Sequence, residues 1–115
     1  MHFQVRTDNH IPNSEALIES VRAEVEAAIH PRFTHWVRRI EVYLQDTNAP
    51  KGGIDTRCSI EASLSGHQPI AVAEMAENVD DAVSGAIDKL VRVLDKTMGR
   101  LDDKGGRTSM SGEPT

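Results

Sequence analysis

The chain has 115 residues, the size of one small domain, because two separate hydrophobic cores could hardly be built from so few. Its 18 acidic and 13 basic side chains give a net charge of −5, unlike most nucleic-acid-binding proteins, so any RNA contact must come from a local cluster of cations. One cysteine excludes an internal disulfide, and no segment resembles a signal peptide or a membrane span, so we expect a cytoplasmic protein without membrane association.

The first predicted elements are a strand and a helix. Residues 2–6 alternate Phe3 and Val5 with polar side chains, which is the period of a half-buried strand. Asn13 or Ser14 can then cap a helix, in which apolar side chains recur at steps of three and four residues: Leu17, Ile18, Val21, Val25, Ala28 and Ile29. Because Pro31 cannot continue a helix interior, we expect this helix to end near His30.

Three more strands are predicted in the middle of the chain. Apolar and polar side chains alternate over residues 36–45 and again over residues 58–64, with the Gly- and Pro-rich stretch "DTNAPKGG" between them. The stretch "SGHQP" has the residues of a tight turn, and Ile70 and Val72 after it indicate a further antiparallel strand.

A second helix is predicted after Asn78 or Asp80, either of which can cap it. Its apolar face consists of Val83, Ala86, Ile87, Leu90, Leu94 and Leu101. At about 100° per residue, four cations fall within an arc of roughly 80° on a neighbouring face, and we call them the basic stripe: Lys89, Arg92, Lys96 and Arg100. Asp81, Asp88, Asp95 and Asp102 collect on a third side, a segregation of charge that packing alone does not demand.

The element order is therefore β-α-β-β-β-α, of the α+β class, with a four-stranded mixed sheet and both helices on one face. The predicted core includes Val5, Leu17, Val21, Val25, Val42, Ile60, Val72, Ile87, Leu90 and Leu94. The other face would be polar and without a stacking array of aromatic rings, carrying Glu41, Tyr43, Arg57, Ser59, Glu61 and Ser63. Residues 1–101 form the predicted domain, and residues 102–115, rich in Gly, Ser and Pro, a disordered tail.

Three stretches together resemble one known family: "NSEALIESV" after the first strand, "PKGGIDTRCSIEASLSGHQPIAV" through the strands, and "AIDKLVRVLDKTMGRL" in the last helix. Over about residues 1–101 the chain is similar to the ribosome hibernation promoting factor and ribosome-associated inhibitor A family, also called sigma-54 modulation proteins. The resemblance implies a double-stranded-RNA-binding-domain-like fold that binds small-subunit ribosomal RNA over the messenger RNA path and the tRNA sites, and silences translation under stress or in stationary phase. Nothing matches the C-terminal dimerisation domain of long family members, so a short form is expected.

The same resemblance implies the RNA-binding residues. In the family a basic series in the last helix contacts ribosomal RNA phosphates, and Lys89, Arg92, Lys96 and Arg100 match it. The first helix of many relatives is also basic, whereas here Glu24 and Ala27 stand where lysines are frequent and Arg22 is the main cation. Further cations from the strands and loops are expected to supplement this surface: Arg38, Arg39, Lys51 and Arg57.

The remaining sequence features do not predict a catalytic, metal-binding or nucleotide-binding site. "PKGG" lacks the glycine spacing and helix of a phosphate-binding loop, the histidines have no metal-ligand spacing, and Cys58 and Trp36 suit structural positions. No nucleophile with a base or converging carboxylate pair is evident, so we expect neither an enzyme nor a cofactor. The alternative function is a protein-interaction module, in which the acidic first helix meets a basic partner or modulates another stress-response factor.

Overall fold

The computed structural model describes residues 1–47 and 55–106, with side chains up to residue 99. Its elements in chain order are β1 (His2–Thr7), α1 (Glu15–Ile29), β2 (Val37–Asp46), β3 (Thr56–Leu64), β4 (His67–Ala76) and α2 (Val79–Gly106). The predicted order and the α+β class are confirmed.

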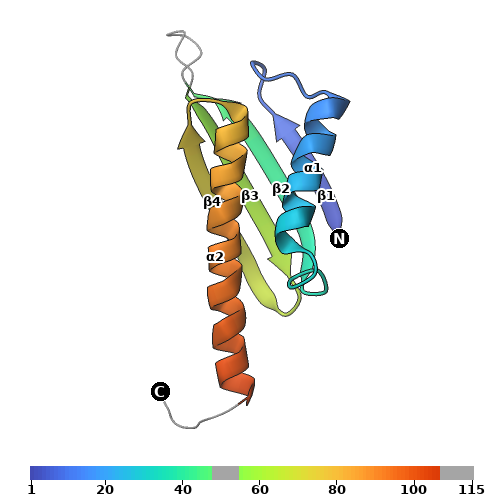
Figure 1. Ribbon diagram of the computed structural model, residues 1–115, viewed down its shortest axis with the longest axis vertical. Coiled ribbons are helices and arrows are strands. Elements are labelled where there is room, and N and C mark those ends of the chain that lie inside the picture. Colours follow the sequence, from blue (N-terminus) through green and yellow to red (C-terminus); the bar gives the residue numbers. More distant parts are fainter. Residues whose placement is uncertain (48–54, 107–115) are drawn as a thin grey trace.

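The strands form one mixed sheet in the order β1-β2-β3-β4. β1 pairs in parallel with β2 because α1 carries the chain back across the sheet between them, and the later strands pair antiparallel through shorter connections. Both helices lie on one face, as predicted, with α1 beside β1 and β2 and α2 along β3 and β4 (Figure 1). The two helices therefore cover different halves of the sheet.

Side-chain caps fix where both helices begin. Ser14 caps α1, since its hydroxyl oxygen accepts a hydrogen bond of 3.1 Å from the backbone N–H of Leu17. Asn78 caps α2 in the same way, accepting from the N–H of Asp81 at 2.8 Å. α2 continues to Gly106, past the predicted domain boundary at residue 101, and residues 107–115 of the predicted tail lie outside the described residues.

The core lies between the helices and the sheet. Eight of the ten predicted core residues are buried, and they are Val5, Val21, Val25, Val42, Ile60, Ile87, Leu90 and Leu94. Leu17 and Val72 are only partly buried and pack against the margin of the core. Phe33, which no periodic pattern marked, is 1% exposed because the turn after α1 folds back, with its N–H donating to the Ile29 carbonyl at 2.8 Å.

Neither α1 nor α2 covers the opposite face of the sheet (Figure 1). Along β2, Ile40, Val42 and Leu44 are buried, while Glu41 and Tyr43 between them are partly exposed. The register shift near the start of this strand makes Arg38 an extra residue between Val37 and Arg39. On this open face the Arg6 guanidinium lies 5.3 Å from the centroid of the Tyr43 ring.

Candidate nucleic-acid interface

Three members of the basic stripe lie on the solvent side of α2. Leu90 and Leu94 are fully buried against the sheet, and the nearby Lys89, Arg92 and Lys96 are exposed. The structure therefore confirms that these three cations share an outer face of the helix. The side chain of Arg100, the fourth member, lies outside the described residues.

Lys89 differs from its neighbours because it is held by the adjacent strand. Its Nζ atom lies 2.8 Å from Glu74 Oε1 and donates a hydrogen bond of 2.9 Å to the backbone carbonyl of Ala73. Both partners belong to β4, which is one of the two edge strands of the sheet. The N-terminal end of the stripe thus lies at this edge of the sheet, and Glu74 neutralises the charge of Lys89 there.

Arg92 and Lys96 present their charges to solvent. Both side chains are exposed, and neither makes a hydrogen bond or ion pair with any residue in the described part of the chain. A cation without an internal partner can meet a phosphate oxygen without first breaking a contact within the protein. These two residues are the most available members of the stripe.

The acidic side of α2 faces the other helix. Asp95 is ion-paired with Arg32 in the turn after α1, and the Arg32 guanidinium also lies 4.8 Å from the centroid of the Phe33 ring. Ser84 donates a hydrogen bond of 2.6 Å to Glu24 of α1. Glu24 thus links the two helices, and the basic stripe is left on the side away from α1.

The remaining predicted cations do not gather around the stripe. Arg22 of α1 lies at the β1 side, with its guanidinium 5.1 Å from the centroid of the Phe3 ring and its Nε atom 4.0 Å from Glu19. Arg39 is on the open face and is ion-paired with Glu41, while Arg38 is exposed at the bulge. Because α2 runs back along β4 (Figure 1), its later residues, Arg92 and Lys96 among them, lie toward the end of the sheet where β2 begins.

Two supplementary cations have other positions. Arg57 donates to Ser59 at 2.6 Å and to Gln45 at 3.4 Å, so it is held among polar side chains of the open face. Lys51 lies outside the described residues, as does the rest of "PKGG".

Trp36 packs edge-on against His67, with ring centroids 6.4 Å apart, which suits the structural role predicted for it.

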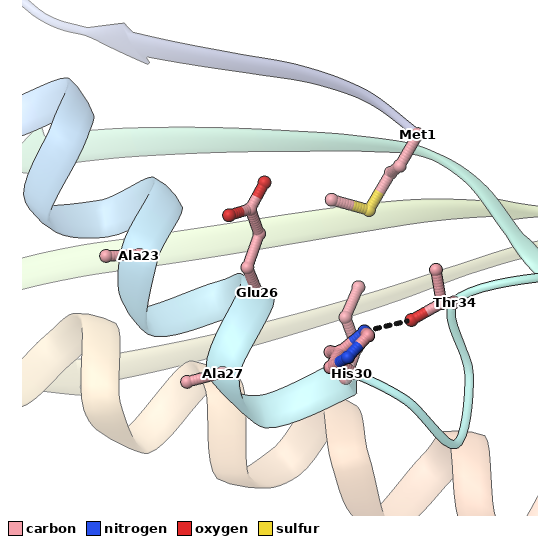
Figure 2. A pocket seen from close by; sticks show the side chains of 7 residues that line it. Met1, Ala23, Glu26, Ala27, His30 and Thr34 are labelled. Carbon is pink, nitrogen blue, oxygen red and sulfur yellow. Dashed lines mark hydrogen bonds between the residues drawn. The ribbon is translucent and has the colours of Figure 1, made fainter.

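A cavity of about 570 Å³ lies beside the C-terminal end of α1, near Met1 (Figure 2). It is lined by Met1, Ala23, Glu26, Ala27, Ile29, His30 and Thr34. His30 Nδ1 lies 3.2 Å from Thr34 Oγ1, but among the described contacts Glu26 makes no hydrogen bond to the imidazole. If the Thr34 hydroxyl were a nucleophile and His30 its base, a third group would have to orient the imidazole. Among the described contacts, the Glu26 carboxylate does not do so.

Cys58 is an inward-facing residue of β3 and is fully buried. Burial raises the pKa of its thiol to about 12, and the charge of Glu24 acts in the same direction while that of Arg57 opposes it. The reactive thiolate is correspondingly scarce near neutral pH.

We therefore expect Cys58 to react with a chromogenic disulfide reagent only when the protein unfolds, because the thiolate is scarce and the sulfur is inaccessible. The measurement is thiol titration in buffer and in denaturant. Cys58→Ala should fold and keep whatever activity the wild type has. Rapid labelling of the native protein, or loss of activity in a folded Cys58→Ala variant, would contradict a purely structural role.

Metal ligation and membrane spanning find no support in the described segments. Within them, no group of three or more His, Cys, Asp or Glu side chains is placed to hold a metal ion. None of the helices there combines the length and apolar character needed to cross a bilayer.

Comparison with known proteins gave one family match and similar solved structures. The family model of the Sigma 54 modulation protein / S30EA ribosomal protein matches residues 4–102. A ribosomal subunit interface protein from Coxiella burnetii superposes with a TM-score of 0.72 at 18% identity, covering 86% of this chain and 99% of the other. The N-terminal domain of Protein Y from Thermus thermophilus superposes with a TM-score of 0.68 at 16% identity, covering 84% of this chain and 99% of the other. A search of curated proteins found no match.

Proposed function

This chain belongs to the Sigma 54 modulation protein / S30EA ribosomal protein family, and on that premise we propose that it is a ribosome-associated translation inhibitor, or hibernation factor. In this proposal it acts in the cytoplasm under stress or in stationary phase. It binds small-subunit ribosomal RNA over the messenger RNA path and the tRNA sites, and it blocks initiation by occupying that space. The proposal includes no catalytic step and no cofactor.

The observation that carries the RNA-binding part is the availability of Arg92 and Lys96. In a chain with net charge −5, two exposed cations stand side by side on α2 without a partner among the described residues, and the neighbouring Asp95 is neutralised by Arg32. Cations free to displace the counterions of RNA supply most of the electrostatic affinity for phosphate. We assign these two residues the main phosphate contacts, and Arg100 extends the same series along the helix.

The other predicted cations have smaller roles in this proposal. Arg38 is exposed toward the same end of the sheet and can add a contact. Arg39 and Arg22 lie near Glu41 and Glu19, so each must exchange a carboxylate for a phosphate before it contributes. The overall negative charge opposes weak binding to arbitrary RNA, so affinity depends on a target whose shape matches the protein.

A protein-interaction module is the second candidate, favoured by the exposed carboxylates of α1. Glu15, Glu19 and Glu26 are all exposed, and the cavity beside Glu26 has apolar walls that a basic, partly apolar segment would fit. The two candidates differ in what the protein sediments with. A ribosome-binding factor travels with small subunits or whole ribosomes in a sucrose gradient of stationary-phase extract, and a module for another partner does not.

The direct test of the proposal is cell-free translation. Purified protein added in excess over ribosomes should suppress synthesis in proportion to the ribosomes occupied, without consuming any reagent. Boiled protein and an equal amount of an unrelated acidic protein are the controls. Normal synthesis at saturating protein would disprove the inhibitor function.

A further inference from the structure

The edge strand β4 and the helix α2 are joined by polar contacts around Lys89. Lys89 reaches from α2 to β4, where its ammonium meets the Glu74 carboxylate at 2.8 Å and the Ala73 carbonyl at 2.9 Å. Lys89 is about half exposed at the side chain, and Glu74 about one third. The contact therefore lies at the rim of the stripe, where RNA would also approach.

Gly85 makes room for this contact. A Cβ atom at position 85 would lie 2.6 Å from Glu74 Cγ and 3.1 Å from Glu74 Oε2, so the Glu74 side chain packs directly against the helix backbone. Gly85 stands one turn before Lys89 on the same side of α2. Glycine is less favourable than alanine in a helix interior. Here it allows the carboxylate to lie close to the helix, within reach of the lysine.

We propose that Glu74 determines how many cations of the basic stripe are available to RNA. Its carboxylate, seated on Gly85, holds and neutralises Lys89, so phosphate contacts are confined to the part of the stripe that begins at Arg92. Glu74 acts through Lys89 and is a positioning residue. The inference rests on the proposed function and adds to it a residue that limits affinity.

The strength of the effect follows from the exposure of the pair. An ion pair between partly exposed side chains stabilises weakly, so releasing Lys89 from Glu74 can raise the affinity for phosphate only severalfold. Each additional phosphate contact steepens the dependence of log affinity on log salt by about 0.7–0.9. Removing the carboxylate charge therefore changes both the affinity and its salt dependence, whereas a purely structural contact would leave the salt dependence unchanged.

The test measures binding of the full chain to purified bacterial small ribosomal subunits across a salt series. Glu74→Gln keeps the shape of the side chain over Gly85 and should raise affinity about two- to fivefold, the range expected for releasing an exposed ion pair. The magnitude of its salt slope should rise by up to about 0.9. Lys89→Gln should have little effect alone, and it should abolish the gain when combined with Glu74→Gln.

Glu77→Gln is the matched control, because it removes the same charge from the exposed segment before α2, where Glu77 makes no ion pair among the described residues. If Glu74→Gln behaves like Glu77→Gln, or if Lys89→Gln alone costs as much as Arg92→Gln, the inference is wrong. Those results leave the proposed function standing as long as Arg92→Gln weakens binding. Failure of the wild type to bind small subunits would instead overturn the proposed function, and this inference with it.

Discussion

Replacing Arg92 and Lys96 with glutamate should lower the affinity for small ribosomal subunits about 100-fold or more, because two charge-assisted contacts are lost and repulsion replaces them. The magnitude of the salt slope should fall by about 1.4–1.8, the share of two phosphate contacts. Both side chains are exposed and have no partner in the described part of the chain, so the unfolding free energy should barely change. Cosedimentation over a salt series and urea unfolding measure the two quantities.

Controls for this variant separate position from net charge. Arg6→Gln removes one positive charge from the open face of the sheet, away from both helices, and Arg92→Gln removes the same charge from the stripe. Only Arg92→Gln should weaken binding. Asp88→Lys shifts the net charge in the opposite sense on the acidic side of α2 and should leave binding unchanged or strengthen it. Asp95 is unsuitable for this purpose because it pairs with Arg32. A double variant that still cosediments like the wild type would show that the stripe is only a solvated face.

The fold could be predicted because its elements have strong local patterns. The period of two in β2 and β3 and the three- and four-residue steps in both helices leave one arrangement in which all apolar faces meet. Phe33 was not predicted as a core residue because it belongs to a turn, where no periodic pattern distinguishes a buried residue from an exposed one. Leu17 and Val72 have the right period but sit at the margin of the core, and exposure there depends on the dimensions of the sheet.

The candidate site was predictable only as far as helix geometry extends. The arc containing Lys89, Arg92 and Lys96 follows from residue spacing alone. The ion-pair partners from other elements cannot be predicted from this spacing. Glu74 is fifteen residues before Lys89, and Arg32 lies sixty-three residues before Asp95. Only the folded chain brings them together, and these contacts distinguish the neutralised end of the stripe from its available cations.

The second large effect concerns the support of α2. Leu90 is fully buried on the apolar face of α2, beside the face that carries the stripe, and its truncation to alanine should reduce the free energy of unfolding by about 2–5 kcal/mol. Part of this cost is the lost transfer free energy of the removed carbon atoms. The rest comes from the cavity that remains because the helix and the sheet cannot move together to fill it. Urea unfolding followed by circular dichroism gives the value.

Met75→Ala is the matched truncation, since Met75 is 50% exposed on β4 and its loss should change stability by no more than about 0.5 kcal/mol. A cost below half a kcal/mol for Leu90→Ala would mean that α2 does not pack on the sheet through this residue. At temperatures where Leu90→Ala remains folded, its affinity for small subunits should stay close to that of the wild type, because Arg92 and Lys96 keep their positions on an intact helix. The stripe and the core of α2 thus make separable contributions, one to binding and the other to stability.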